Sequence, residues 1–352
     1  MSFTSTFDWV PRGLTFTDTA QDHDLHIHYG AEHAFSDSDT ADPTYQIKTT
    51  TPNPSYLTPP FWIKSIVSQH SKSLILLESR NGPQEPGFAA PKDVFYAAVK
   101  SLGLKKEQVG RIVGKNGSLT DYFFSGSVSD ASLDIAFRWT SKPGCYVIFF
   151  GRFTSRVSMG ALDTNRMAAV VSHRGLFPSS ISKKHDNNDA QNNDVMDHEL
   201  KFALVNRAEE IQENPLRVFT VLLQECVCHL DEEIHELGVR LEDTPSGAVA
   251  QIAKEMAPDI CGLKKACNDL LAICEGYSDV AKILSEQLRI TSTDTCVHGL
   301  RRDAHETKML VERRLEKLNY IDGNHPQPTT TTGRRRRYGR RQRREATGGN
   351  HL

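Results

Sequence analysis

The sequence predicts an α+β protein, in which a small mixed α/β domain precedes a bundle of long antiparallel, coiled-coil-like helices and a disordered tail. Short runs rich in β-branched and aromatic residues occur between residues 61 and 150. Apolar residues recur every three or four positions between residues 219 and 318, which is the period of a helix. A length of 352 residues allows two domains, each with a core of its own.

Residues 1–60 are predicted to form an acidic, largely irregular arm. They are rich in Thr, Asp and Pro and end in Pro52-Asn-Pro-Ser-Tyr-Leu-Thr-Pro-Pro60, which favours loops over helix. The densest group of residues that could bind a metal lies here: His23, His26, His28 and His33. His26 and His28 would share one face of a strand. Their spacing matches no established zinc pattern, so we assign no metal to them.

Residues 61–178 are predicted to form the α+β domain. The strand-like runs are 61–67, 74–77, 133–139 and 146–150, and a turn at Lys142-Pro-Gly separates the last two. A helix is predicted over 91–102, closed by Gly103. Within this domain Gly114-Lys-Asn-Gly117 resembles the backbone-gripping loop of a KH RNA-binding module, but no regular apolar helix follows it. An ordinary surface turn is the alternative.

Residues 179–197 are predicted to be a polar linker, and residues 198–322 to form the long-helix bundle. A first apolar stripe runs from Phe219 to Leu241 and breaks at Thr244-Pro-Ser-Gly247. A third, weaker helix is expected from about Asp294 to Tyr320. Because the connection near residue 244 is short, the first two helices should be antiparallel.

The second stripe has the strict three-and-four spacing of a coiled-coil seam. Its residues are Ile260, Leu263, Cys267, Leu270, Cys274, Tyr277, Leu284 and Leu288. Burying each large side chain contributes about 1.5–3 kcal/mol, so we expect this helix to pack against neighbours. The same stripe could serve self-association, and the sequence does not distinguish the two.

The seven cysteines are odd in number and form no CxxC pair, which is typical of reduced cytosolic thiols. The N-terminus lacks the basic start and apolar run of a signal peptide. The most apolar short segment, 145–150, is far shorter than the roughly 18–20 residues that span a bilayer. These features predict a cytoplasmic protein, with a nuclear location as the alternative.

Residues 323–352 are predicted to be a disordered, Arg-rich tail. Its arginines are Arg334, Arg335, Arg336, Arg337, Arg340, Arg341, Arg343 and Arg344. With Glu345 they give the tail a charge of +7, whereas the body has 34 basic and 43 acidic residues, a charge of −9. Eight guanidinium groups attract phosphate, so the tail either binds RNA or another polyanion or is an unselected segment.

No enzyme is predicted. The sequence contains no nucleophile elbow, phosphate-binding loop or HExxH motif, and no catalytic Cys/His signature. The acidic residues between 231 and 243 fit the solvated face of a helix, and His229 and His235 lie among them without the spacing of metal ligands. The sequence identifies no cofactor.

The order of these parts resembles the cytosolic region of the CorA-like metal-ion (magnesium) transporter proteins of filamentous fungi. Three segments carry the resemblance: Phe61-Trp-Ile-Lys-Ser-Ile-Val-Ser, Arg138-Trp-Thr-Ser-Lys-Pro-Gly-Cys-Tyr and Asn214-Pro-Leu-Arg-Val-Phe-Thr-Val-Leu-Leu. They are similar to the family's tryptophan-led strand, its Trp-plus-basic segment and the start of its first long helix. The resemblance covers residues 60–320 and implies an α+β domain followed by long helices.

The sequence departs from this family after Tyr320. The resemblance implies two membrane-spanning segments with a Gly-Met-Asn signature, but Asp322-Gly-Asn-His-Pro and the arginine tail are found instead. Either the chain is a soluble relative, or the reading frame leaves the family's frame near residue 322. The leading hypothesis is a non-enzymatic interaction or regulatory scaffold that binds a protein partner or a second copy through its helices. The alternative is an RNA-binding protein that uses its tail.

Overall fold

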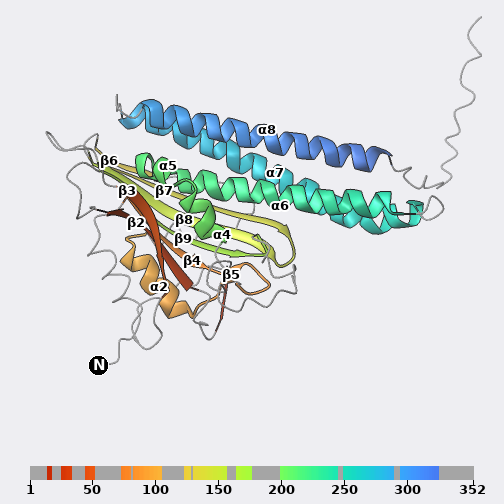
Figure 1. Ribbon diagram of the computed structural model, residues 1–352, viewed down its shortest axis with the longest axis horizontal. Coiled ribbons are helices and arrows are strands. Elements are labelled where there is room, and N and C mark those ends of the chain that lie inside the picture. The colour runs from red at the N-terminus through yellow and green to blue at the C-terminus, as the bar shows by residue number, and fades with distance from the viewer. Residues whose placement is uncertain are drawn as a thin grey trace, which may run out of the picture.

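A mixed seven-stranded sheet lies between helix α2 on one face and helices α4 to α8 on the other in this computed structural model (Figure 1). The structure describes residues 14–17, 25–33, 44–51, 73–80, 82–104, 123–127, 130–156, 164–176, 199–244, 249–288 and 294–324. The α+β class predicted from the sequence is confirmed. Within the described segments, no helix combines the length and the apolar character needed to cross a membrane.

The strand order of the large sheet is β3-β2-β4-β9-β8-β7-β6. The strands are β2 (Leu25–His33), β3 (Thr44–Thr50), β4 (Leu74–Ser79), β6 (Phe123–Ser127), β7 (Asp130–Lys142), β8 (Cys145–Arg156) and β9 (Thr164–Arg174). Neighbouring strands are antiparallel except β4 and β9, which are parallel. A separate parallel pair joins β1 (Thr15–Phe16) to β5 (Gly87–Phe88).

Strand β4 shows why the sheet is covered on both faces. All six of its side chains are buried. Leu74 and Leu76 face helices α4 to α8, whereas Ile75 and Leu77 face α2. A continuous apolar run is typical of a strand packed on both sides, since successive side chains point to opposite faces.

Helix α2 (Lys92–Ser101) covers one face of the sheet through an aromatic cluster. The ring of Phe95 lies 4.3 Å from that of Phe88 and 5.7 Å from that of Phe150. The helix ends before Gly103, whose φ of 70° lies in the left-handed region that glycine adopts without strain. The predicted helix and its stop are both confirmed.

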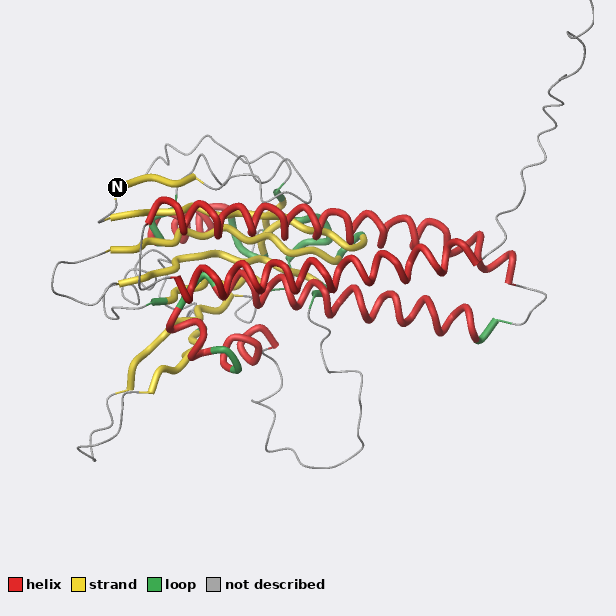
Figure 2. Tube along the Cα trace, turned by 90° about the horizontal axis from the view of Figure 1, so that it is seen from above, coloured by secondary structure: helices red, strands yellow, loops and turns green. Residues whose placement is uncertain are grey.

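The other face carries α4 (Glu199–Val205), α5 (Ala208–Glu213) and three long helices. The long helices are α6 (Arg217–Glu242), α7 (Val249–Leu288) and α8 (Asp294–Asn324). At 1.5 Å per residue, the 40 residues of α7 extend about 60 Å. Figures 1 and 2 show the three helices side by side and reaching past one end of the sheet.

Ion pairs between the long helices define their directions. Arg240 of α6 lies 3.8 Å from Asp259 of α7, and Thr220 of α6 bonds Tyr277 of α7, so these helices run antiparallel. Glu275 of α7 pairs with Lys308 of α8 at 2.9 Å, and Lys264 of α7 pairs with Asp322 of α8 at 2.5 Å. Helices α7 and α8 are therefore antiparallel as well.

The bundle is tied to the sheet by aromatic residues. The indole Nε1–H of Trp139 on β7 donates to the backbone oxygen of Ala266 on α7 at 2.9 Å. Phe219 on α6 packs against Phe137 of the sheet and Tyr277 of α7, with ring centroids 5.0 Å and 4.5 Å apart. The strand containing Trp139 and the first long helix were both predicted, but their contact was not.

The coiled-coil stripe lies in one continuous helix, as its spacing predicts. Seven of its residues are buried within this single chain: Ile260, Leu263, Cys267, Leu270, Cys274, Tyr277 and Leu284. They pack in one core with the sheet and with the other long helices. The side chain of Leu288 is outside the described part. Packing within the chain therefore accounts for the stripe, and self-association through it stays a prediction that this burial argues against.

The prediction of an irregular arm over residues 1–60 is wrong for three segments, the first of which, residues 15–16, forms β1 of the small parallel pair. Residues 25–33 and 44–50 form β2 and β3 of the large sheet. Polar residues obscured the pattern, because His26 and His28 are buried on one face of β2 while Ile27 faces α2. Strand β9 was also missed. The domain boundaries at 60, 178, 197 and 322 stay predictions.

Several predicted segments lie outside the described residues. They are the 61–67 run, the 114–117 loop, the 179–197 linker and the arginines of the tail.

Candidate functional site at the sheet–helix interface

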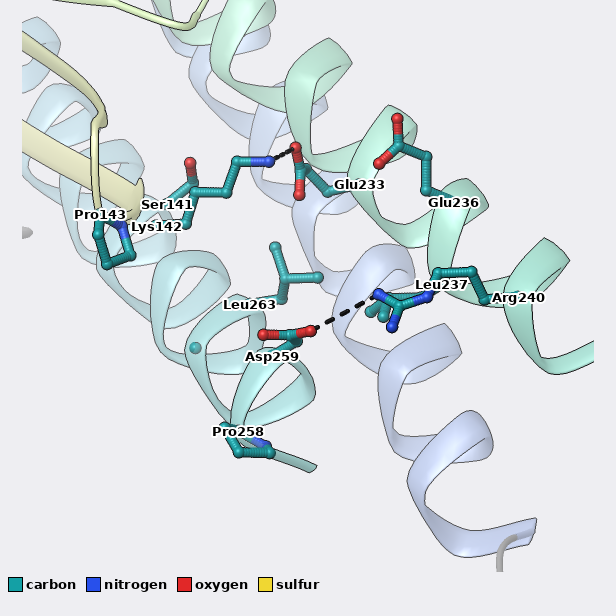
Figure 3. Close-up of a pocket in the computed structure, with 11 residues that line it drawn as sticks. Ser141, Lys142, Pro143, Glu233, Glu236, Leu237, Arg240, Pro258, Asp259 and Leu263 are labelled. Carbon is teal, nitrogen blue, oxygen red and sulfur yellow. Dashed lines mark hydrogen bonds and ion pairs between the residues drawn. The ribbon is translucent and has the colours of Figure 1, made fainter. Parts of the chain in front are cut away.

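A cavity of about 250 Å³ lies where the β7–β8 turn meets α6 and α7 (Figure 3). The end of β7 contributes Lys142, the turn contributes Pro143, α6 contributes Glu233 and Glu236, and α7 contributes Asp259. The turn forms at Pro143-Gly144 as predicted, and Gly144 has a φ of 79°. The cavity lies where the sheet meets both helices, and it is the first candidate site.

Charged side chains at the cavity form pairs across its walls. The Lys142 ammonium donates to the Glu233 carboxylate, and Figure 3 shows this pair pointing across the cavity from β7 to α6. Partial burial lowers the pKa of Lys142, but the hydrogen bond and negative charge of Glu233 outweigh it and raise that pKa. Lys142 therefore stays charged near neutral pH and holds the turn against α6.

This pair belongs to the His229 cluster, which consists of His229, Ser141, Cys145, Glu233 and Lys142. The Nε2 atom of His229 is 3.0 Å from Ser141 Oγ and 3.1 Å from Cys145 Sγ. Burial raises the pKa of the Cys145 thiol, and burial also lowers the pKa of His229 against the opposing effect of Glu233. Both shifts favour the neutral thiol and the neutral imidazole near neutral pH.

This cluster lacks the geometry of a catalytic triad. A triad places the nucleophile at one ring nitrogen of histidine and the carboxylate at the other. Here Glu233 Oε1 lies 3.8 Å from Nε2, the same atom that faces Ser141 and Cys145. Because a thiol reacts as its thiolate, the raised pKa of Cys145 also opposes nucleophilic chemistry.

A second group, the Glu78 cluster, consists of Glu78, His28, His173, Arg80 and Thr49. The Glu78 carboxylate is fully buried and lies 2.8 Å from His28 Nε2, 2.7 Å from His173 Nε2 and 3.1 Å from Arg80 Nε. The other ring nitrogen of His28 is 2.9 Å from Thr49 Oγ1. The cluster therefore connects β2, β3, β4 and β9 on the face that carries Leu74 and Leu76.

The histidines determine the charge of Glu78. Burial raises the pKa of a carboxyl group, but the hydrogen bonds and attraction from His173 and His28 outweigh it and hold the pKa of Glu78 well below its usual value. Both Nε2 atoms point at the carboxylate rather than at a shared vacant position. Across the described segments, no group of three or more His, Cys, Asp or Glu residues is arranged to hold a metal.

The histidine pair singled out in the sequence takes part in this cluster only through His28. His26 and His28 share one face of β2, as predicted, with ring centroids 6.5 Å apart. His23 and the side chain of His33 lie outside the described residues. Sequence reasoning missed Glu78 and His173. The sequence did contain a signal for this cluster: Glu78 follows Leu74 and Leu76 at the two-residue period of a strand, so its carboxylate lies on the same buried face. A carboxylate buried in this way requires a partner.

A third polar group, the bundle network, holds the long helices in register. Arg217 of α6 lies 2.8 Å from Asp303 of α8, and the Tyr277 hydroxyl of α7 is 3.1 Å from Thr220 Oγ1. Gly299 leaves room for this arrangement, since a Cβ there would lie 2.5 Å from an Arg217 nitrogen. These contacts specify how the three helices align.

The fold and these clusters define an α+β domain with a polar interface between its sheet and three long helices. The sequence matches no protein-family model and no curated protein. Among solved structures, the soluble domain of CorA from Methanocaldococcus jannaschii is similar with a TM-score of 0.39 and 10% identity, over 72% of this chain and 88% of that one. The cytoplasmic domain of ZntB from Vibrio parahaemolyticus has a TM-score of 0.35 and 8% identity, over 84% and 96%. Similarity at this level assigns no family, so the function has to be inferred from the chain's own residues.

Proposed function

We propose that this chain is a non-enzymatic interaction or regulatory scaffold resembling the cytosolic region of CorA-like metal-ion transporter proteins. The observation that carries the proposal is the long-helix layer, which the sheet and the bundle network hold in one arrangement. Helices that extend beyond the sheet present side chains that the domain's own core does not use. Such a surface is suited to binding a protein partner or a second copy of the chain.

The overhanging end offers two large exposed apolar residues. Val239 of α6 and Tyr320 of α8 are 40% and 72% exposed. Both lie near the same end of the bundle, because Asp231 of α6 pairs with Arg314 of α8 and the two helices run in the same direction. We place self-association on this surface rather than on the buried stripe of α7.

Light scattering after size-exclusion chromatography tests this proposal across a concentration series. The full chain should show a mass above that of one copy at high concentration. Val239→Glu with Tyr320→Glu should lower that mass, because a carboxylate is costly to bury without a partner. Phe202→Glu on α4 is the matched control, since Phe202 is 68% exposed and outside this end. A single-copy mass at every concentration would refute self-association.

A second function is favoured by the sequence of the tail. Its eight arginines would bind RNA or another polyanion, and about six phosphate contacts on a single strand give a logarithmic salt slope of roughly −4. The test compares the full chain with one that ends at Asn324 and keeps all of α8, using a single-stranded RNA. Equal weak binding by both would eliminate this function, whereas tight binding that truncation abolishes would demote the scaffold.

A further inference from the structure

A buried histidine of α6 lies at the contact between this helix and the β7–β8 turn. His229 is 5% exposed, and its Nε2 atom faces the hydroxyl of Ser141 and the thiol of Cys145. Both groups can donate, and we assign the Nδ1–H tautomer, in which the Nε2 lone pair accepts from them. The edge of the imidazole also meets the Trp139 ring, with centroids 6.1 Å apart at 87°.

Charged groups approach this imidazole from the same side. Glu233 of α6 lies 3.8 Å from Nε2, but its carboxylate already accepts from Lys142 of β7. On the α7 wall, the charged residue is Asp259, which pairs with Arg240 of α6. A proton on Nε2 would therefore leave two cations, Lys142 and the His229 imidazolium, beside the single carboxylate of Glu233.

We propose that His229 is a proton-operated latch, whose protonation releases the β7–β8 turn from α6. A proton from solvent on Nε2 turns the acceptor into a donor, so the Cys145 thiol loses its acceptor and the Ser141 hydroxyl has to rotate and accept instead. The new imidazolium competes with Lys142 for Glu233, which weakens the second tie between the turn and the helix. The adjacent cavity gives these side chains and water room to rearrange.

The Glu78 cluster responds differently and serves as an internal comparison. His28 and His173 already direct their Nε2 atoms at a carboxylate, so these bonds use N–H donors in either protonation state. A second proton on either histidine therefore breaks no hydrogen bond to the Glu78 carboxylate. Burial lowers the pKa of His229, so the latch stays closed at neutral pH and opens as the pH falls below the ordinary range of histidine.

Hydrogen exchange of the full chain, followed by mass spectrometry and corrected for intrinsic pH dependence, tests the latch. Between pH 7.5 and 5.5, exchange in peptides covering the β7–β8 turn should rise about fivefold to tenfold, the effect of losing one hydrogen bond. His229→Gln should abolish that rise because its amide does not titrate. His235→Gln, an exposed position on the same helix, is the matched control and should retain it.

A second variant covers the case in which His229→Gln does not fold, as judged by circular dichroism. Lys142→Met removes the competing cation, so Glu233 is free to stabilise the imidazolium. The rise in exchange should then move to higher pH. A turn whose exchange is unchanged in the native chain between pH 7.5 and 5.5 would overturn the proposal. So would a transition that Lys142→Met does not move, or one that a folded His229→Gln retains.

Discussion

Replacing Glu78 by Gln should destabilise the protein far more than its single-atom change suggests. The carboxylate is fully buried and receives three donors, from His28, His173 and Arg80. An amide presents one oxygen to them and turns its NH₂ group towards another donor. Removing one partner of a buried ion pair costs about 3–5 kcal/mol, so Glu78→Gln should lose that much free energy of unfolding at pH 7.

The same residue makes a prediction about pH. The pKa of Glu78 in the folded chain lies well below its ordinary value of 4.5, so the folded state favours the ionised form. The stabilisation is therefore complete above about pH 4.5 and is lost as pH falls through the lower, folded pKa. The difference between the native chain and Glu78→Gln should shrink over that acidic interval.

Urea unfolding followed by circular dichroism measures both effects. The free energy of unfolding would be compared at pH 7 and in steps below pH 4.5, with Glu85→Gln as the control because Glu85 is exposed. The control should stay within about 0.5 kcal/mol of the native chain. A Glu78→Gln variant within about 1 kcal/mol of the native chain at pH 7 would refute the reasoning. So would a difference that stays constant as pH falls.

Three further predictions concern the helices and the thiols. Phe219→Ala should lower the free energy of unfolding by about 3–5 kcal/mol in urea, because it empties a fully buried aromatic site between sheet and bundle; a loss below about 1 kcal/mol would contradict this packing. Gly299→Ala should displace Arg217 from Asp303 and lower the thermal midpoint, whereas Gly262→Ala, with no neighbour within 4 Å of its added Cβ, should not. In native alkylation followed by mass spectrometry, exposed Cys261 should be modified well before buried Cys145, and equal rates would contradict the burial of that thiol.

The helices and several strands were predictable because their side-chain period is local. The spacing from Ile260 to Leu284 identifies one helix, and the alternation from Leu133 to Trp139 identifies a strand, without any knowledge of the rest of the chain. Strand β9 was missed because its buried apolar residues are few, lying only between Met167 and Val171, and its two ends are polar. Such a run has no clear period of its own.

The polar clusters were not predictable from sequence because their members are distant along the chain. Glu78 is 50 residues from His28 and 95 from His173, and His229 is 84 residues from Cys145. Burial of a charged residue becomes favourable only when the fold supplies its partners. Local pattern therefore assigned β2 to an irregular arm, since two of its core positions are histidines.

The parallel pairing of β4 with β9 joins the three strands β3-β2-β4 to the meander β9-β8-β7-β6. Each group can form from antiparallel neighbours, but their junction requires segments some ninety residues apart to meet in the correct alignment. Shifting β9 by a single residue would turn His173 to the opposite side of the sheet and leave Glu78 buried with too few donors. The electrostatic penalty of that error would disfavour misaligned assembly where the two halves of the sheet come together.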